Sequence, residues 1–314
     1  MTPGWTKRPW FHSYLIWYSR VRRAEKVLVL GGTGFLGGYF VQALGKRAIA
    51  QTTKSSYIAT EVNIQKMQFD RNQIGAAKAF LEEQDCGTVI NSIALADIEK
   101  CEQNENLANW TNCELPGILS AISKSLDCKF VHISTDAVFD GSASFRNESD
   151  IPSPLSIYGK SKWNGEQLVL DHNPDAIVAR VNFFGKSINK PSLFNYFYEN
   201  LTSGNSVLGF TDVYFTPLYA NDTVRIIMEL IDLKAKGLYH VVGSERISKF
   251  QFGVLVSEAF NLHAAYLKQG QMLGMGGAEL RSPDLSLSND KIKSLGINLP
   301  TIMDGLAILK KSIT

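Results

Sequence analysis

The stretch KVLVLGGTGFLGGYFVQAL constrains the fold of this chain more than any other part of the sequence. A short valine and leucine run at residues 27–30 leads directly into glycines, and apolar residues at helical spacing follow. Gly31 permits a tight turn, Gly34 lets a pyrophosphate approach the backbone, and Gly37 lets the helix pack closely on the strand. This order of strand, turn and helix predicts a dinucleotide-binding unit whose helix N-terminus faces the phosphates.

The spacing G-x-x-G-x-x-G differs from G-x-G-x-x-G and favours the short-chain dehydrogenase/reductase branch of dinucleotide-binding proteins. Glycine trios also occur in purely structural turns, so the prediction depends on the flanking strand and helix. The residues expected to contact a cofactor in this loop are Gly31, Thr33, Gly34, Phe35, Leu36 and Gly37.

Residues 48–52 are expected to form the second strand, and no acid follows them to hold an adenosine ribose. The sequence QTTKSS stands there instead, where Lys54 could meet a 2′-phosphate. NADP(H) is therefore favoured over NAD(H), while a solvated loop lysine is the alternative interpretation of Lys54.

Two further segments are predicted to approach the cofactor. The sequence QFDR places Asp70 and Arg71 after another short strand, near the expected position of an adenine, although a simple turn would also explain them. A strand at residues 88–91 ends in small residues that could let the cofactor cross the sheet edge. The cofactor contacts expected there are Ser92, Ile93 and Ala94.

Strands and helices alternate through the N-terminal half, with a helix expected at 106–125 and a strand at 130–134. This alternation predicts an α/β fold, a Rossmann-type doubly wound parallel sheet with ligands at the carboxyl ends of its strands. Three regions are expected: a basic aromatic N-terminal extension at 1–24, an NAD(P)-binding Rossmann domain with the catalytic residues at 25–185, and a smaller, mainly substrate-binding region at 186–314.

The run IYGKSKWNGE places Tyr158 and Lys162 one turn apart if it is helical. A lysine ammonium beside a phenol favours the phenolate and is expected to lower the pKa of Tyr158 from its reference value of about 10. Thr135, or its neighbour Ser134, could hold a substrate carbonyl while Tyr158 gives it a proton. Only one of the two hydroxyls should face the site, because side chains alternate along a strand. A surface helix pair is the alternative for Tyr158 and Lys162, and His132 is assigned no role.

Four runs, GGTGFLG, STDAVFDG, IPSPLSIYGKSKWNGE and VARVNFFG, carry a family resemblance. Together they resemble the extended short-chain dehydrogenase/reductases, most closely the dTDP-4-dehydrorhamnose reductase family, from about Lys26 to the C-terminus. The resemblance implies that Thr135, Tyr158 and Lys162 are catalytic and that NADPH reduces a 4-keto group on a nucleotide-linked hexose. Arg281 could pair with a diphosphate or instead form a surface salt bridge. The residues expected to bind substrate are Asp136, Asn182, Phe183 and Arg281.

Two departures from the family pattern affect the substrate side. Ala137 stands where the family usually has Tyr, and Leu95 and Ala96 stand where it usually has Tyr and Thr. Sites that hydrogen-bond a sugar discriminate between substrates through such groups. These changes therefore put the dTDP-rhamnose substrate in doubt but leave the reduction reaction intact.

The C-terminal part is predicted from a few local signals. An aromatic-rich helix is expected at 192–201, and a proline-bearing loop at 215–220 leads into a helix that Asn221 or Asp222 would cap.

Composition excludes several classes of protein. The net charge of +2 gives no case for nucleic acid, and four cysteines without a C-x-x-C pair suggest neither a metal site nor disulfides. No apolar run is long enough to span a bilayer, so a cytoplasmic protein is expected, and a homodimer is left open. The aromatic, basic extension is interpreted as a leader or a partner contact, with a weak interfacial helix as the alternative.

The sequence therefore favours an NADP(H)-dependent reductase of a nucleotide sugar. A sugar epimerase or dehydratase on the same fold is one alternative. A non-catalytic, NADP-binding regulatory subunit is another, because the β subunit of methionine adenosyltransferase is a relative of this family that uses the scaffold in that way.

Overall fold

The computed structural model describes residues 26–53, 62–187 and 192–313, and Lys54 and the N-terminal extension lie outside these ranges. Its centre is a seven-stranded, wholly parallel sheet in the order β11-β6-β5-β4-β1-β2-β3. The strands are β1 (Val27–Leu30), β2 (Ala48–Thr52), β3 (Asn63–Lys66), β4 (Thr88–Asn91), β5 (Lys129–Thr135), β6 (Ile177–Val181) and β11 (Gly237–Val241). The predicted Rossmann-type fold is confirmed.

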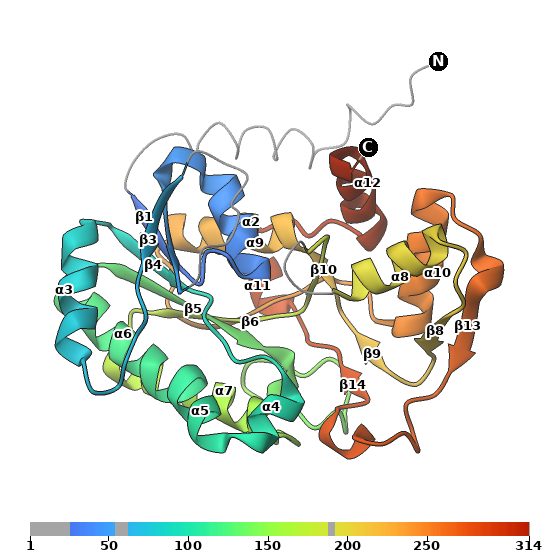
Figure 1. Cartoon of the computed structure of the whole chain (residues 1–314), viewed down its shortest axis with the longest axis horizontal. Helices are drawn as coiled ribbons and strands as arrows, with labels where there is room; N and C mark the ends of the chain where they lie inside the picture. Colours follow the sequence, from blue (N-terminus) through green and yellow to red (C-terminus); the bar gives the residue numbers. More distant parts are fainter. Residues whose placement is uncertain (1–25, 54–61, 188–191, 314) are drawn as a thin grey trace.

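Helices cover both faces of this sheet, as Figure 1 shows. One face carries α2 (Phe35–Leu44), α9 (Ala220–Asp232) and α11 (Asp290–Ser294), and the other carries α3 (Ile74–Gln84), α6 (Leu115–Ser125) and α7 (Ile157–His172). Side chains of β1 alternate between the two layers, with Val27 and Val29 in one apolar cluster and Leu28 and Leu30 in the other. Burial on both faces explains why the strand is apolar throughout.

The direction of strand order reverses between β1 and β4, which are neighbours in the sheet. In open parallel sheets, ligands bind in the crevice outside the carboxyl ends of the strands at such a reversal. The glycines after β1 and the small residues after β4 both lie at this position.

The helix predicted at 106–125 is present but not uniform. It consists of α5 (Glu105–Asn109), a π-helical turn at Trp110–Glu114 and then α6, and it follows the short helix α4 (Ile98–Gln103). An insertion of this kind re-aims the side chains that follow it and is frequent near functional sites.

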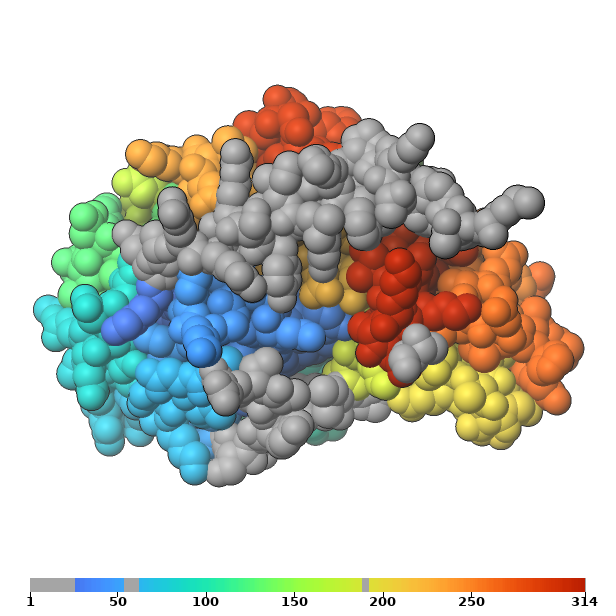
Figure 2. Space-filling model, turned by 90° about the horizontal axis from the view of Figure 1, so that it is seen from above, coloured from blue at the N-terminus to red at the C-terminus, as the bar shows by residue number. Residues whose placement is uncertain are grey.

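A C-terminal lobe, made of α8 (Leu193–Thr202), β8 (Val207–Phe210), α10 (Lys249–Phe260), β13 (Leu267–Gly270) and α12 (Ile302–Ile313), packs beside the sheet. Its core is rich in phenylalanine, including Phe194, Phe197, Phe215 and Phe252. Short strand pairs connect the lobe to the sheet: β7 (Phe183–Phe184) with β10 (Leu218–Tyr219), and β9 (Tyr214–Phe215) with β12 (Ile247–Ser248) and β14 (Asp284–Leu285). In Figure 2, α12 lies between the α2 side of the molecule and α10.

The predicted cap of α9 by Asn221 or Asp222 is wrong. The helix begins at Ala220 with Tyr219 as its N-cap residue, and no side chain bonds the first turn. Asp222 instead pairs with Arg225 one turn later, at 3.3 Å. Burial explains the difference. Leaving the ionised Arg225 unpaired on a helix packed against the sheet would cost more free energy than leaving the helix end without a side-chain cap.

Within the described ranges, none of the helices combines the length and apolarity that crossing a bilayer would require.

Candidate active site

The glycine loop after β1 has the geometry of a phosphate-binding turn. Gly31 has φ +76°, a conformation that side chains disfavour. A Cβ at Gly37 would overlap the Gly31 carbonyl oxygen, so only glycine lets α2 approach the turn this closely. Gly34 is the N-cap of α2, and no side chain occupies the start of the helix, where unpaired N–H groups favour anions. The loop therefore fits a dinucleotide pyrophosphate.

Gln51, near the end of β2, has a role in this loop that the sequence analysis missed. Its Oε1 accepts a hydrogen bond from Gly31 N at 2.9 Å, and its Nε2 donates to the Met67 carbonyl. Thr33 Oγ1 lies 3.1 Å from Thr52 Oγ1, which ties the loop to β2 a second time. The buried amide thus orders the turn and leaves no carboxylate beside it.

Ser92 and Ile93, after β4, lie against Gly31, as predicted for the sheet reversal. A Cβ on Gly31 would be 3.1 Å from both Ile93 N and Ser92 Oγ. Ser92 Oγ also donates to the Leu30 carbonyl at 2.7 Å, and Ala94 follows in the same loop. These contacts bring the two segments of the expected cofactor crevice together.

Phe35, at the first turn of α2, contacts Phe183 of β7 with ring centroids 5.0 Å apart. Phe35 is a predicted cofactor residue and Phe183 a predicted substrate residue. Their contact places Phe183 beside the glycine loop, where the two expected sites meet.

Asp70 and Arg71 line a cavity of about 640 Å³ beyond β3, together with Phe69, Leu107 and Trp110. Arg71 lies over the Trp110 ring, 5.3 Å from its centroid, and 3.6 Å from the Glu114 carboxylate. Asp70 also closes a turn by accepting from Asn72 N at 2.8 Å. The turn interpretation of Asp70 therefore holds alongside its position in a cavity large enough for a planar base.

The predicted catalytic residues of β5 and α7 come together at the carboxyl end of β5. Thr135 lies near the Tyr158 phenol, and its hydroxyl donates to Asp136 Oδ1 at 3.1 Å. Asn182 donates its amide to the other Asp136 oxygen. Burial raises the pKa of Asp136 to about 6, against the lowering effect of Asn182, Lys249 and Thr135.

Ser134 has different partners from Thr135. Its hydroxyl donates to the buried Glu166, which also pairs with Arg180 at 2.7 Å. All three side chains are buried, and Arg180 stacks over Phe139. This cluster holds α7 on the sheet, so Thr135 is the hydroxyl that faces Tyr158.

Lys162 does not act on Tyr158 in the expected way. Burial raises the pKa of Tyr158 to about 12, and the nearby Thr135 hydroxyl opposes this rise. The Lys162 amine donates to the Ile133 carbonyl at 2.6 Å and lies 3.2 Å from His132 Nε2. Its own pKa is lowered to about 8, chiefly by burial. The expected lowering of the phenol pKa by Lys162 is therefore corrected: desolvation dominates.

His132 and Asn112 contact the site but were not predicted as site residues. His132 is fully buried between Lys162 and Asn91. Asn112, in the π-helical turn, bonds the backbone of Leu95 in both directions and donates to Ser161. The runs STDAVFDG and IYGKSKWNGE predicted that this region carries the site. Only the packing of α7 on the sheet shows which side chains meet there.

A second cavity, of about 460 Å³, opens between the sheet and the C-terminal lobe. Ala137 and Ser156 line it on the catalytic side, and Lys249 and Arg281 are the only cations among its lining residues in the described ranges. Arg281 forms an ion pair with Glu99 and donates to the Gly277 carbonyl at 2.8 Å. The salt-bridge interpretation of Arg281 thus holds, and the same side chain also borders this cavity.

Comparisons with known proteins agree with this arrangement. A family model described as the RmlD substrate binding domain matches residues 25–311. A probable low-salt glycan biosynthesis reductase, Agl14, of Haloferax volcanii is 32% identical over 91% of this chain and 97% of its own length. The methionine adenosyltransferase 2 subunit beta of Rattus norvegicus is 24% identical over 88% of this chain and 84% of its own length.

Solved structures share the fold over nearly the whole chain. A hypothetical dTDP-4-dehydrorhamnose reductase from Sulfolobus tokodaii has 30% identity and a TM-score of 0.77, covering 89% of this chain and 98% of its own. The dTDP-4-dehydrorhamnose reductase of Bacillus anthracis, solved in complex with NADP, has 21% identity and a TM-score of 0.78, covering 93% and 100%.

Proposed function

Because the chain belongs to the family of the RmlD substrate binding domain, an oxidoreductase family, we propose that it is an NADP(H)-dependent reductase of a keto group on a nucleotide-linked sugar. The observation that carries the proposal is the proximity of the buried Thr135 and Tyr158 side chains at the end of β5, in a sheet whose β1 turn fits a pyrophosphate. Neither feature alone distinguishes a reductase, but their combination supplies a proton donor beside a hydride-carrying cofactor site.

The nicotinamide cofactor would supply the hydride, and this chain supplies the proton and the orientation. Thr135 holds the carbonyl oxygen, and Tyr158 donates its phenolic proton to that oxygen as it gains negative charge. With its pKa at about 12, the phenol stays protonated at neutral pH, which suits a proton donor in reduction. Burial of the site excludes water and strengthens both hydrogen bonds.

NADP(H) remains favoured over NAD(H) in this proposal. Gln51 replaces the acid that would repel a 2′-phosphate, and its amide is already committed to Gly31 and Met67. Arg71 offers a guanidinium in the neighbouring cavity, and Lys54 is proposed to add a second cation. The Bacillus anthracis relative was solved with NADP, which is consistent with this preference.

The region at 186–314 is proposed to bind most of the substrate, with Arg281 as one contact, and Asp136, Asn182 and Phe183 of the Rossmann domain are proposed as further contacts. A cytoplasmic location is proposed because all four cysteines are thiols and none is in a disulfide, and a homodimer remains a proposal.

A regulatory subunit is the second candidate, because the methionine adenosyltransferase 2 subunit beta relatives align over most of this chain. An epimerase on the same fold is a further alternative, and a dehydratase is less favoured, since Asp136 is the one acid in the TDAV run.

One experiment separates these functions. The purified full chain is mixed with NADPH and a panel of nucleotide 4-keto sugars, and absorbance of the reduced nicotinamide is followed. Oxidation that Tyr158→Phe abolishes and Tyr266→Phe, an exposed control, retains supports the reductase. Tight NADPH binding without oxidation on any sugar supports the subunit instead.

A further inference from the structure

The cavity between the sheet and the C-terminal lobe has an unusual composition for a sugar site. Its walls are mostly aliphatic, aromatic or methionine side chains, including Leu155, Leu193, Leu208, Phe210 and Met272. Sugar hydroxyls find few hydrogen-bond partners on such walls, so a polar group of the ligand must be bound at one of the few polar positions.

Lys249, at the first turn of α10, is one of the two cations that line the cavity within the described residues. Its Nζ lies 3.5 Å from the centroid of the Phe215 ring, and no group in the part of the chain that the structure describes accepts a hydrogen bond from it. The ring face stabilises the cation and leaves the N–H groups that point away from the ring available to a ligand.

The acidic side chains near Lys249 already have other hydrogen-bond or ion-pair partners. Asp136 attracts Lys249 electrostatically, but its two oxygens accept from Thr135 and Asn182, and the two side chains form no ion pair within 4 Å. Glu99 is paired with Arg281 at the cavity wall. The cavity therefore contains an ammonium whose charge no carboxylate neutralises by direct contact.

An ammonium among apolar walls is costly unless an anion reaches it. Burial lowers the pKa of Lys249 to about 8, and Asp136 opposes that change, so the amine is mostly protonated at neutral pH. An anionic oxygen entering the cavity would gain a charge-assisted hydrogen bond there.

A nucleotide sugar can carry two kinds of anion, the diphosphate and a carboxylate on the sugar. The position of Lys249 indicates which of the two it would bind. Lys249 lines the same cavity as Ala137 and Ser156, which lie two residues from Thr135 and Tyr158, so the ammonium is on the side where the reacting carbonyl would lie. Arg281 borders the same cavity on a different segment, after the Gly277 loop, and is the proposed diphosphate contact. Ala137, with only a methyl side chain, lines the cavity on the catalytic side.

We propose that Lys249 is a specificity-determining residue that binds a carboxylate on the sugar, so that the substrate is a nucleotide-linked keto sugar acid. The inference rests on the proposed reductase function and narrows its substrate class. Lys249 does not enter the chemical step; it orients the ring so that the keto group faces Thr135 and Tyr158.

Binding of unreactive ligands tests this without turnover. The full chain saturated with NADPH is titrated by calorimetry with UDP-glucuronate and UDP-glucose, which carry no keto group to reduce and differ at C6, where a carboxylate replaces a hydroxymethyl group, and with the matching dTDP pair. Wild-type protein is expected to prefer the acid of at least one pair by about tenfold or more. Lys249→Met, which keeps the aliphatic stem, should reduce that preference to less than about twofold, and Lys249→Arg should retain part of it.

Lys268→Met, an exposed lysine of the same lobe, is the control and should leave the preference unchanged. Equal affinity for acid and neutral sugar in the wild type, or failure of both acids to bind, overturns the inference. An equal loss for both members of a pair in Lys249→Met also overturns it, because that result assigns Lys249 to the diphosphate. NADPH oxidation decides the reductase function separately, so the two failures are distinguishable.

Discussion

Nζ of Lys162 lies 3.2 Å from Nε2 of His132, and the direction of this hydrogen bond is fixed by residues farther from the site. Ile93 N donates to Asn91 Oδ1, so the Asn91 amide nitrogen faces His132 Nδ1 as a donor. His132 Nδ1 is then an acceptor, and the ring proton is on Nε2. In this tautomer the hydrogen bond forms only with the neutral Lys162 amine, which becomes the main form above its pKa of about 8.

Replacing His132 by Phe is expected to raise the pKa of Lys162 above about 8. A hydrogen bond to the neutral form disfavours the charged form, so its loss favours the ammonium. Asn91→Leu should act in the same direction, because it frees His132 to protonate Nδ1 and to accept from Lys162. Titration of the ¹³Cε resonance of Lys162 measures the change, and His172→Gln should leave it unaltered. A lower pKa in both variants would contradict the assigned tautomer.

Loss of the Thr135 hydroxyl should affect catalysis, whereas loss of the Ser134 hydroxyl should affect stability. Thr135→Val is expected to lower kcat by about 10²-fold or more, since it removes the hydroxyl that positions the carbonyl, with little change in NADPH affinity. Ser134→Ala removes a hydrogen bond to the buried Glu166 and should cost about 1–3 kcal/mol in the free energy of unfolding. Steady-state kinetics and urea unfolding of both variants check this. Loss of kcat in Ser134→Ala alone would reverse the two roles.

Gly37 and Gly38 provide a matched pair in α2. A Cβ at Gly37 would overlap the Gly31 carbonyl, whereas a Cβ at Gly38 meets no atom within 4 Å. Gly37→Ala is expected to weaken NADPH binding at least about tenfold by shifting the turn. Gly38→Ala should retain binding and stabilise the helix by about 0.5–1 kcal/mol. Fluorescence titration with NADPH and thermal unfolding give both values, and equal affinities would show that the turn does not need this close approach.

His240 should make the fold sensitive to acid. Burial and Arg180 lower its pKa to about 3, from an ordinary value of 6.5. The unfolded chain takes up this proton first as pH falls, so stability is full above about 6.5 and is lost progressively down to about 3, at roughly 1.4 kcal/mol per pH unit.

Asp136 and Asp222 act in the opposite direction, because burial raises the pKa of each to about 6. The contribution of His240 is therefore read from the difference between wild type and His240→Phe. Urea unfolding between pH 7 and 4 should show a smaller loss in the variant, and parallel curves would refute the assignment.

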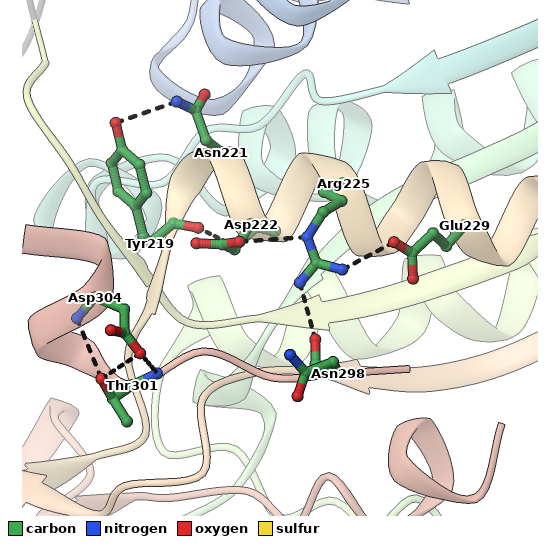
Figure 3. A network of polar contacts seen from close by, with 9 residues as sticks. Tyr219, Asn221, Asp222, Arg225, Glu229, Asn298, Thr301 and Asp304 are labelled. Atoms are coloured by element: carbon green, nitrogen blue, oxygen red, sulfur yellow. Dashed lines mark hydrogen bonds and ion pairs between the residues drawn. The ribbon is translucent and has the colours of Figure 1, made fainter. Parts of the chain in front are cut away.

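Arg225 anchors the segment before α12 to α9, as Figure 3 shows. Its guanidinium lies 2.8 Å from Glu229 and 2.9 Å from the Asn298 carbonyl, in addition to its pair with Asp222. Arg225→Met should cost about 3–5 kcal/mol, because Asp222 would remain as an unpaired buried carboxylate. Adding Asp222→Asn should recover part of that loss. Urea unfolding measures both, and no recovery in the double variant would show that Asn298 is the important partner.

The sequence by itself determined the elements whose signals are local. The strand–glycine–helix unit, the strands at 48–52 and 88–91 and the helix carrying Tyr158 were all predictable, because each depends on neighbouring residues, on glycine φ or on apolar periodicity. The alternation of these elements also fixed a parallel sheet, since few connections are allowed between parallel strands.

Only the tertiary structure decided how the side chains of distant elements are used. Gln51 orders the glycine loop from β2, His132 and Asn91 orient Lys162 across two strands, and Lys249 reaches a cavity far along the chain from Tyr158. Burial also reversed the expected effect on the phenol, because desolvation depends on the packing around Tyr158 and not on its spacing from Lys162. Local spacing specifies which residues can meet, but the solvent exclusion that sets their chemistry arises only when the lobes pack.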